Sequence, residues 1–311
     1  MSTAQARVVA LSGGVGGARL AYGLSRVVAP QMLTVVVNTG DDFDHWGLRI
    51  CPDLDTVMYT LSERSDDERG WGLRGDTFHT LDAVGAAGGT DWFRLGDRDL
   101  VTHLVRTEAL ARGEPLTAIT ARLCAAAEVP ARVLPMTDGD CRTFVETELH
   151  GKLPFQDWLV RHRAPEVVGV SFQGRPFASK AVLEAIDAAD VVIIGPSNPF
   201  VSIDPILSLS GMREALTRRP VVAVSPIVHG KAVKGPLAEM FPALESVPAS
   251  PDAVVRHYGE LLSGLVMEAG DPRPDTRISV LSTATIMKTR AERVRLAREV
   301  LEFALGIRST R

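Results

Sequence analysis

Acidic side chains gather in two short segments near the start of the chain. Asp41 and Asp42 end the segment NTGDD, which begins at Asn38 and follows an apolar run. Asp53 and Asp55 stand two residues apart in the segment PDLDT. Carboxylate oxygens are ligands that Mg²⁺ prefers, and protein-bound Mg²⁺ commonly bridges to substrate phosphates. We therefore expect Asp41 and Asp55 to hold one divalent ion and to act on a phosphorylated substrate.

Each of these acids also has a purely structural interpretation. Asp53 suits the N-cap of the following helix as well as it suits a ligand, and both interpretations stay open. Asp55 falls inside that helix, where a cap is not needed, which favours a ligand. The segment 38–42 is also compatible with a turn whose acids are solvated.

A glycine-rich turn precedes the acids. Four glycines occupy five positions, at Gly13, Gly14, Gly16 and Gly17, between an apolar run and a helical pattern. Such glycines let backbone N–H groups approach a phosphate, and the helix N-terminus adds partial positive charge. The turn matches neither the GxGxxG dinucleotide motif nor the Walker motif. We expect contact with a phosphate or substrate here, whereas a tight turn without a ligand is the alternative.

Two later segments carry polar groups suited to an anionic ligand. The segment GPSNP, residues 195–199, follows an apolar run and offers Ser197 and Asn198 to a nucleotide, although a rigid turn would have the same residues. The segment RLGDRD begins at Arg94, and an arginine there suits an anion. For His103, in the helix that follows, a packed histidine and a catalytic base are the two interpretations.

The elements that must position these residues alternate between strand and helix. Apolar runs predict strands at 7–11, 33–37, 133–136, 144–148, 191–194 and 221–224. Helical spacing predicts helices at 18–28, 54–61, 77–87, 100–111, 180–189, 206–216 and 291–305. Strand–helix–strand units build parallel sheets, and ligands bind at the carboxyl ends of the strands. We predict a single α/β domain, 1–311, with a doubly wound, mostly parallel, Rossmann-like sheet. A mainly helical insertion at about 53–129 should lie over the C-terminal edge of that sheet.

Composition narrows the class of partner. The 311 residues carry 34 basic and 38 acidic side chains, a net charge of -4, which argues against a nucleic-acid protein with a broad basic face. We find no apolar run near the roughly 18 residues that a membrane span needs, and no signal peptide at the N-terminus. Three isolated cysteines, Cys51, Cys124 and Cys141, suit a reducing compartment. We expect a cytoplasmic protein without nucleic-acid or membrane partners.

Taken in order, the segments resemble one known family, the phospholactate transferases of coenzyme F420 biosynthesis. Members join a phosphorylated three-carbon acid, activated as a guanosine diphosphate ester, to the deazaflavin Fo. The first stretches look most like actinobacterial-type members that use phosphoenolpyruvate. The resemblance runs from Leu11 to about Val228 and is carried by LSGGVGGARL, VVVNTGDD, CPDLDTVMYTL, RGWGLRGDTF, RLGDRDLVTHLVR, LPMTDGD, FQDWLVR, VVIIGPSNPFVSIDPILSLSGMREAL and VVAVSPIV.

The resemblance implies roles by position. The metal and Fo site maps to Asp41, Asp53, Asp55 and Arg94, with Asp97 beside them; Asp41 and Asp55 are the expected catalytic and metal-binding pair. The donor's phosphates and guanosine map to Gly13, Gly14, Gly16, Gly17, Arg19, Asn38, Ser197 and Asn198. The family further implies Mg²⁺ as cofactor and a homodimer. On this basis Asp55→Asn should abolish turnover and leave the fold intact.

Two departures from the family pattern stand out. Arg19 replaces the lysine that many members carry after the glycine-rich turn. The usual MSDD segment is MTDGD here, which puts the roles of Asp138 and Asp140 in question. Two other functions remain as rivals: a sugar-nucleotide-binding regulatory relative without transferase activity, and a dinucleotide oxidoreductase. The NP of GPSNP and the PDLDT segment favour the transferase over the first, and the missing GxGxxG disfavours the second. Phospholactate, phosphoenolpyruvate and phosphoglycerate all remain open as the transferred acid.

Overall fold

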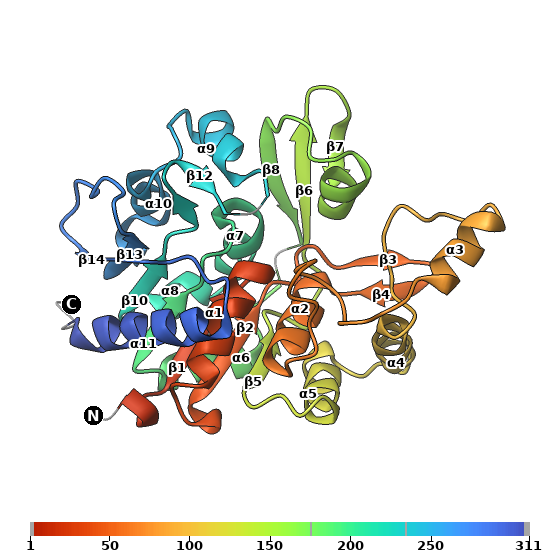
Figure 1. Cartoon of the computed structure of the whole chain (residues 1–311), viewed down its shortest axis with the longest axis horizontal. Helices are drawn as coiled ribbons and strands as arrows, with labels where there is room; N and C mark the ends of the chain where they lie inside the picture. The colour runs from red at the N-terminus through yellow and green to blue at the C-terminus, as the bar shows by residue number, and fades with distance from the viewer. Residues whose placement is uncertain (1–2, 175, 234, 308–311) are drawn as a thin grey trace.

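A seven-stranded sheet in which every pairing is parallel forms the centre of the molecule (Figure 1). The structure, a computed structural model, describes residues 3–174, 176–233 and 235–307. The strand order is β14-β13-β10-β9-β1-β2-β5. The strands are β1 (Val8–Ser12), β2 (Leu33–Val37), β5 (Arg132–Pro135), β9 (Val191–Ile194), β10 (Val221–Val224), β13 (Gly264–Glu268) and β14 (Ser279–Thr283). The predicted doubly wound α/β fold is confirmed.

The strand order reverses beside β1, and this reversal is what makes a ligand crevice. From β1 the chain builds outward to β2 and β5 on one side, and later to β9, β10, β13 and β14 on the other. Ser12 pairs with Val37, and Leu11 pairs with Ile194. The three segments that follow these strands therefore leave the same edge of the sheet, where α/β proteins bind ligands.

Both faces of the sheet are covered because its strands are apolar on both sides. Along β1, Val8 and Ala10 belong to one buried cluster, and Val9 and Leu11 belong to the other. Four helices supply side chains to the first cluster: α1 (Val15–Ser25), α2 (Pro52–Leu61), α5 (Leu116–Ala126) and α11 (Arg290–Gly306). The second cluster receives side chains from α6 (Lys180–Ala188), α7 (Asp204–Leu207), α8 (Met212–Leu216), α9 (Leu237–Glu245) and α10 (Pro251–Tyr258).

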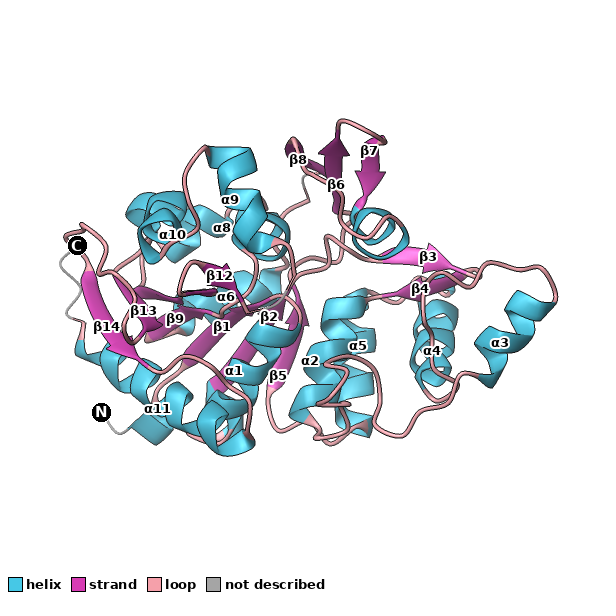
Figure 2. Ribbon diagram, turned by 45° about the horizontal axis from the view of Figure 1, so that its top comes forward, coloured by secondary structure: helices cyan, strands magenta, loops and turns pink. Residues whose placement is uncertain are grey.

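The segment between β2 and β5 carries most of the additional helices. It contains the hairpin β3 (Phe43–His45) and β4 (Leu48–Ile50), then α2, α3 (His79–Ala86), α4 (Asp99–Ala111) and α5 (Leu116–Ala126). The mainly helical character of this segment and the helices α2, α3 and α4 were predicted; α5 and the hairpin were not. Figure 2 shows α3 and α4 projecting from the side of the molecule away from α11.

A small second sheet stands over the carboxyl edge of the first. Its order is β7 (Gly151–Pro154), β6 (Arg142–Thr147), β8 (Gly169–Gln173), all antiparallel. The π-helical turn η3 (Asp157–Arg161) follows β7. A short hairpin, β11 (Ile227–Val228) and β12 (Lys231–Ala232), precedes α9. Within the described ranges, no helix combines the length and the apolar character needed to cross a bilayer.

The helix predicted over 206–216 is wrong in one respect, because it is two helices. The π-helical turn η4 (Pro199–Ile203) leads into α7, and α8 begins only after Gly211. Gly211 has φ 83°, a left-handed conformation that favours glycine and ends helical continuity. The apolar spacing persists across the break because Ile206, Met212 and Leu216 all join the same buried cluster.

Candidate active site

A cavity of about 750 Å³ opens at the carboxyl edge of the main sheet. Its walls come from segments far apart in the chain: the glycine-rich turn, the start of α2, residues 68–72 and 93–95, the η3 region, and the loop 196–202. The loop after β14 and the start of α9 complete it. The cavity thus collects the segments that the sequence marked as chemically interesting.

The glycine-rich turn packs directly against the loop after β9. The backbone N–H of Gly13 donates to Ser197 Oγ at 3.0 Å. A Cβ on Gly16 would lie 2.3 Å from the carbonyl oxygen of Pro196, and one on Gly17 would lie 2.7 Å from Ser197 Oγ. Close approach therefore requires these glycines. Gly14 and Gly16 line the cavity at the N-terminus of α1, whereas Gly13 and Gly17 are not among its lining residues.

The loop after β9 is held by its own side chains and by α9. Asn198 Oδ1 accepts a hydrogen bond from the backbone N–H of Phe200 at 3.0 Å, and its Nδ2 donates to Met240 Sδ at 3.2 Å. Ser197 and Asn198 both line the cavity. The rigid-turn interpretation and the ligand interpretation are therefore compatible in this loop.

Two carboxylates, Asp41 and Asp53, share one amide. Asn38 Nδ2 donates to Asp41 Oδ1 at 3.1 Å and to Asp53 Oδ2 at 3.0 Å. Gln156 Nε2 donates to Asp41 Oδ2 at 3.0 Å. Asp41 and Asp53 line the cavity, with exposed fractions of 5% and 8%. Asp53 is not an N-cap, because that position belongs to Cys51 and Asp53 lies in the first turn of α2.

The electrostatics of this carboxylate pair favour the binding of a cation. Burial raises the pKa of Asp41 well above its ordinary value, and the negative charges of Asp53 and Asp42 raise it further. Burial also raises the pKa of Asp53 to about 7, although the hydrogen bond from Asn38 opposes the change. Two buried carboxylates this close are costly unless a cation joins them.

Asp55 has a different environment from the one expected. Both of its carboxylate oxygens accept hydrogen bonds from the guanidinium of Arg106, one of them at 3.1 Å. Arg106, on α4, is 2% exposed. Burial alone would lower the pKa of Arg106, but the negative charge of Asp55 raises this pKa above its ordinary value. His103 Nδ1 lies 3.6 Å from Asp55 Oδ2. Asp55 is thus already neutralised by the protein itself.

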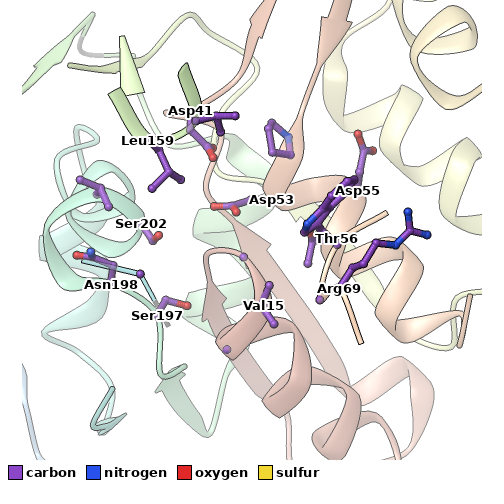
Figure 3. Close-up of a pocket in the computed structure, with 18 of the residues that line it drawn as sticks. Val15, Asp41, Asp53, Asp55, Thr56, Arg69, Leu159, Ser197, Asn198 and Ser202 are labelled. Carbon is purple, nitrogen blue, oxygen red and sulfur yellow. The ribbon is translucent and has the colours of Figure 1, made fainter. Parts of the chain in front are cut away.

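The structure does not bring Asp41 and Asp55 together as a pair. Figure 3 shows Asp41 and Asp53 facing the same space, with Asp55 turned away from them. Within the described part of the chain, no three histidine, cysteine or acidic side chains form a ready-made metal site. The carboxylate that accompanies Asp41 in the cavity is Asp53.

Arginine and aromatic side chains form the wall near Asp55. Arg94 lies over the ring of Phe78, with its Cζ 4.4 Å from the ring centroid. Arg69 lies 5.3 Å from the centroids of both Trp71 and Phe78. Tyr59, Trp71 and Phe93 are among the aromatic residues that line the cavity. Trp46 and Trp92 instead pack around His45 in the β3–β4 hairpin.

Several residues expected at the site lie outside the cavity and make structural contacts instead. Asp97 does not line the cavity; its carboxylate accepts hydrogen bonds from Thr77 Oγ1 and from the first backbone N–H groups of α3. These hydrogen bonds lower the pKa of Asp97, and the bond from Thr77 has the largest effect. Asp138 accepts from the backbone N–H of Thr117 at the start of α5, outside the cavity. Asp140 pairs with Arg142, also outside it.

Arg19 lines the cavity as expected. Its Nη1 donates to the carbonyl oxygen of Met287, another residue of the cavity wall, at 3.3 Å. Burial, and then the nearby charge of Arg293, lowers the pKa of Arg19. An anionic ligand would relieve that repulsion.

Three residues of the site were not identified from the sequence: Gln156, Arg69 and Arg106. Gln156 and Arg106 lie in segments that carried the family resemblance, FQDWLVR and RLGDRDLVTHLVR, and Arg69 opens RGWGLRGDTF. Spacing alone gives no signal that Gln156 faces Asp41, because 115 residues separate them.

Comparison with known proteins agrees with this geometry. A family model described as 2-phospho-L-lactate transferase CofD matches residues 8–279. A phosphoenolpyruvate transferase of Streptomyces coelicolor is 43% identical, with 97% of this chain and 99% of the relative covered. A 2-phospho-L-lactate transferase of Methanosarcina acetivorans is 40% identical, with 97% and 99% covered.

A solved structure supports the fold independently. A UPF0052-family protein from Bacillus halodurans matches with a TM-score of 0.63 at 15% identity, over 96% of this chain and 100% of that one. At this identity the likeness concerns the fold alone. The family match and the near-full-length relatives decide the rest: the chain belongs to the CofD family of 2-phospho-L-lactate transferases, which act in coenzyme F420 biosynthesis.

Proposed function

We propose that this chain transfers a phosphorylated three-carbon acid from its guanosine diphosphate ester to the terminal ribityl hydroxyl of Fo, releasing GMP. The observation that carries the proposal is the set of residues that line the cavity of about 750 Å³ at the carboxyl edge of the main sheet. Segments after β1 and β9 that suit a phosphate line this cavity together with Asp41, Asp53, Asp55 and Arg94. In Figure 3, Ser197 and Asn198 lie on one side of Asp53 and Asp55 lies on the other. The cavity thus has a side suited to a nucleotide and a side suited to a flat ring.

The donor would bind at the glycine-rich turn and the loop after β9. Gly14 and Gly16 expose backbone at the N-terminus of α1, which favours a diphosphate. Ser197, Asn198 and Arg19 line the same part of the cavity. Gly13, Gly17 and Asn38 would support this site from behind, by packing and hydrogen bonding.

The metal ligands we propose are Asp41 and Asp53, with Asp55 reassigned. Both are oxygen donors that are buried together, and among the described residues their side-chain hydrogen bonds come from the neutral amides of Asn38 and Gln156, so the donor set fits Mg²⁺. Bound there, Mg²⁺ would neutralise charge on the diphosphate oxygens. Arg106 already satisfies Asp55, which makes that residue a poor second ligand.

Fo would bind at Asp55, Arg94 and the aromatic wall. The side chains of Arg94, Arg69 and Trp71 offer stacking surfaces of the kind a deazaflavin ring needs. The carboxylate of Asp55 is held in one orientation by Arg106 and offers its oxygens to hydroxyl donors. Asp97 is left out of this set because it caps α3.

The chemistry follows from positioning. The ribityl hydroxyl oxygen attacks the phosphorus that carries the three-carbon acid, the bond from that phosphorus to the GMP oxygen breaks, and the hydroxyl proton leaves to solvent. A phosphodiester and GMP result. Phosphoryl-type transfers of this kind depend on alignment and charge neutralisation more than on covalent help from the protein. The residues of the turn, Arg19 and the walls of the cavity supply that alignment.

The direct test is product formation by the purified protein. Fo, Mg²⁺ and either the phosphoenolpyruvyl or the phospholactyl guanosine diphosphate ester are supplied, and mass spectrometry detects the deazaflavin phosphodiester and GMP. We expect product from at least one donor, and loss of product in Asp53→Asn. A folded protein that gives no product with either ester, yet binds a sugar nucleotide, would replace this proposal with the regulatory function.

Two further expectations concern the protein as a whole. We propose a homodimer, consistent with the exposed apolar side chains Val101 and Leu104 on α4, and sedimentation analysis tests it. We propose a cytoplasmic location, consistent with three buried free cysteines.

A further inference from the structure

Neutral amides hold the carboxylate pair Asp41–Asp53. Asn38 Nδ2 bonds to one oxygen of each, and Gln156 Nε2 bonds to the second oxygen of Asp41 at 3.0 Å. All of these side chains are at most 8% exposed. Fixed hydrogen bonds at this depth set the direction in which each carboxylate points.

The neighbouring acids are treated differently by the fold. Asp55 is paired with Arg106. The side-chain hydrogen bonds that Asp41 and Asp53 accept within the described residues come instead from the neutral amides of Asn38 and Gln156. Hence the fold places an arginine next to Asp55 and neutral amides next to Asp41 and Asp53.

Each amide is itself held in one orientation. Asn38 Oδ1 accepts from the backbone N–H of Gly40 at 2.8 Å, which commits its Nδ2 to the carboxylates. Gln156 lies between β7 and η3, so the small sheet carries it to the cavity. The tight fit around Gly40, where a Cβ would lie 2.6 Å from Thr143 Oγ1, locks this turn against β6.

We infer that Asn38 and Gln156 are positioning residues that orient Asp41 and Asp53 while leaving their joint negative charge to a divalent cation. The inference rests on the proposed metal ligands. The inference also gives the small sheet a function, because this sheet positions Gln156 and Gln156 orients the carboxylate of Asp41. A cationic partner in the same place would hold the carboxylate equally well but would compete with the metal.

Gln156→Lys separates orientation from charge. Lysine keeps an N–H donor of similar reach, and it adds one positive charge beside the pair. We expect the affinity for a divalent ion to fall at least about tenfold, because like charges repel strongly in a buried site. The metal-free protein should not lose thermal stability, since the added charge offsets that of the two carboxylates.

The probe is Mn²⁺, which takes the same oxygen ligands as Mg²⁺ and is detected by electron paramagnetic resonance without turnover. Binding is measured for the full chain, with and without GDP, together with the thermal midpoint. Gln173→Lys is the matched control, because Gln173 is exposed on β8 of the same sheet and makes the same charge change. It should bind Mn²⁺ as the unchanged protein does.

The outcomes distinguish a failure of the inference about Asn38 and Gln156 from a failure of the proposed metal site. Weakened Mn²⁺ binding in Gln156→Lys with an unchanged or higher thermal midpoint supports the inference. Unchanged Mn²⁺ affinity in a folded Gln156→Lys, with binding lost in Asp41→Asn and Asp53→Asn, overturns the inference and keeps the metal site. No saturable Mn²⁺ binding by the unchanged protein under either condition, or binding that survives both Asp→Asn changes, overturns the metal site and the inference together.

Discussion

At the scale of single residues, the main finding is that neighbouring carboxylates have separate roles. Asp53 and Asp55 are two positions apart on α2, yet Asp53 meets the amide of Asn38 and Asp55 meets the guanidinium of Arg106. The pKa of Asp53 is raised to about 7 by burial. For a carboxyl group with a raised pKa, the folded state binds a proton that the unfolded state has lost, so stability falls as pH rises between the two pKa values.

A pH dependence follows for Asp53. Between pH about 4.5 and about 7, the metal-free protein should lose roughly 1–4 kcal/mol of unfolding free energy relative to Asp53→Asn, at about 1.4 kcal/mol per unit of pKa shift. Urea unfolding of both proteins across this range measures the difference, and added Mg²⁺ should remove it. Parallel pH profiles for the two metal-free proteins would argue against a buried, uncompensated Asp53.

A second prediction concerns the buried pair Asp55–Arg106. Asp55→Asn and Arg106→Met should each destabilise the fold by about 3–5 kcal/mol, because each leaves its partner buried without its pair. This replaces the sequence-based expectation that Asp55→Asn leaves the fold intact. The double variant should lose much less than the sum of the two. Additive losses in urea unfolding would mean that the pair is not coupled.

The acids themselves were predictable from the sequence, but their partners were not. Composition and spacing marked Asp41, Asp53 and Asp55, because carboxylates after apolar runs are visible in a single segment. The predicted pairing of Asp41 with Asp55 takes no account of Arg106, because Arg106 is 51 residues from Asp55. Contacts over such separations depend on tertiary packing, which local patterns do not encode.

At the scale of elements, the long helices and the central strands followed from their periodicity. The strand 33–37 was predicted with its observed bounds, and most predicted helices agree to within three residues at each end. The β3–β4 hairpin was missed because its strands are short and its turn places Trp46 at φ 53° before Gly47. A tryptophan rarely adopts a left-handed conformation, so Trp46 does not predict a turn from the sequence. In the structure, Trp46 and Trp92 pack around His45.

The packing of α1 on α11 gives an element-scale prediction. A Cβ on Gly23 of α1 would lie 2.0 Å from the carbonyl oxygen of Arg293 on α11. Gly23→Ala should therefore destabilise the fold by roughly 2–4 kcal/mol, since the two backbones must separate. Gly306→Ala, at the end of α11 with open space around it, should be neutral or stabilising by up to about 1 kcal/mol. Equal thermal midpoints for the two variants would contradict the close contact.

At the scale of the whole molecule, the topology builds the site. The reversal of strand order beside β1 sends the glycine-rich turn, the NTGDD segment and the GPSNP loop to one edge. The alternation of strands and helices was sufficient to predict this edge. Its enclosure by residues 68–72 and by the η3 region was not predictable, because those segments reach the cavity through tertiary contacts.

We also propose that residues 1–311 fold as one domain, including the insertion at about 53–129. Helix α2 lies within that insertion, yet its Val57 and Met58 share a buried cluster with α1 and the main sheet. Urea unfolding followed by tryptophan fluorescence, to which Trp71 and Trp92 of the insertion contribute together with Trp46 and Trp158 outside it, should coincide with unfolding followed by circular dichroism. Two separated transitions would show that the insertion is an independent unit.

The central claim is that one cavity holds Fo at Asp55 and Arg94, opposite the donor and its metal. The most direct measurement is a titration of Fo fluorescence with the purified protein, in the presence of GDP and Mg²⁺. We predict saturable binding, weakened at least about tenfold in Arg94→Ala, because the ring loses its cationic stacking partner. Arg98→Ala, an exposed arginine outside the cavity that bonds the carbonyl oxygen of Arg74, should bind Fo normally. Absence of saturable binding, or equal affinity in Arg94→Ala and the unchanged protein, would contradict the account.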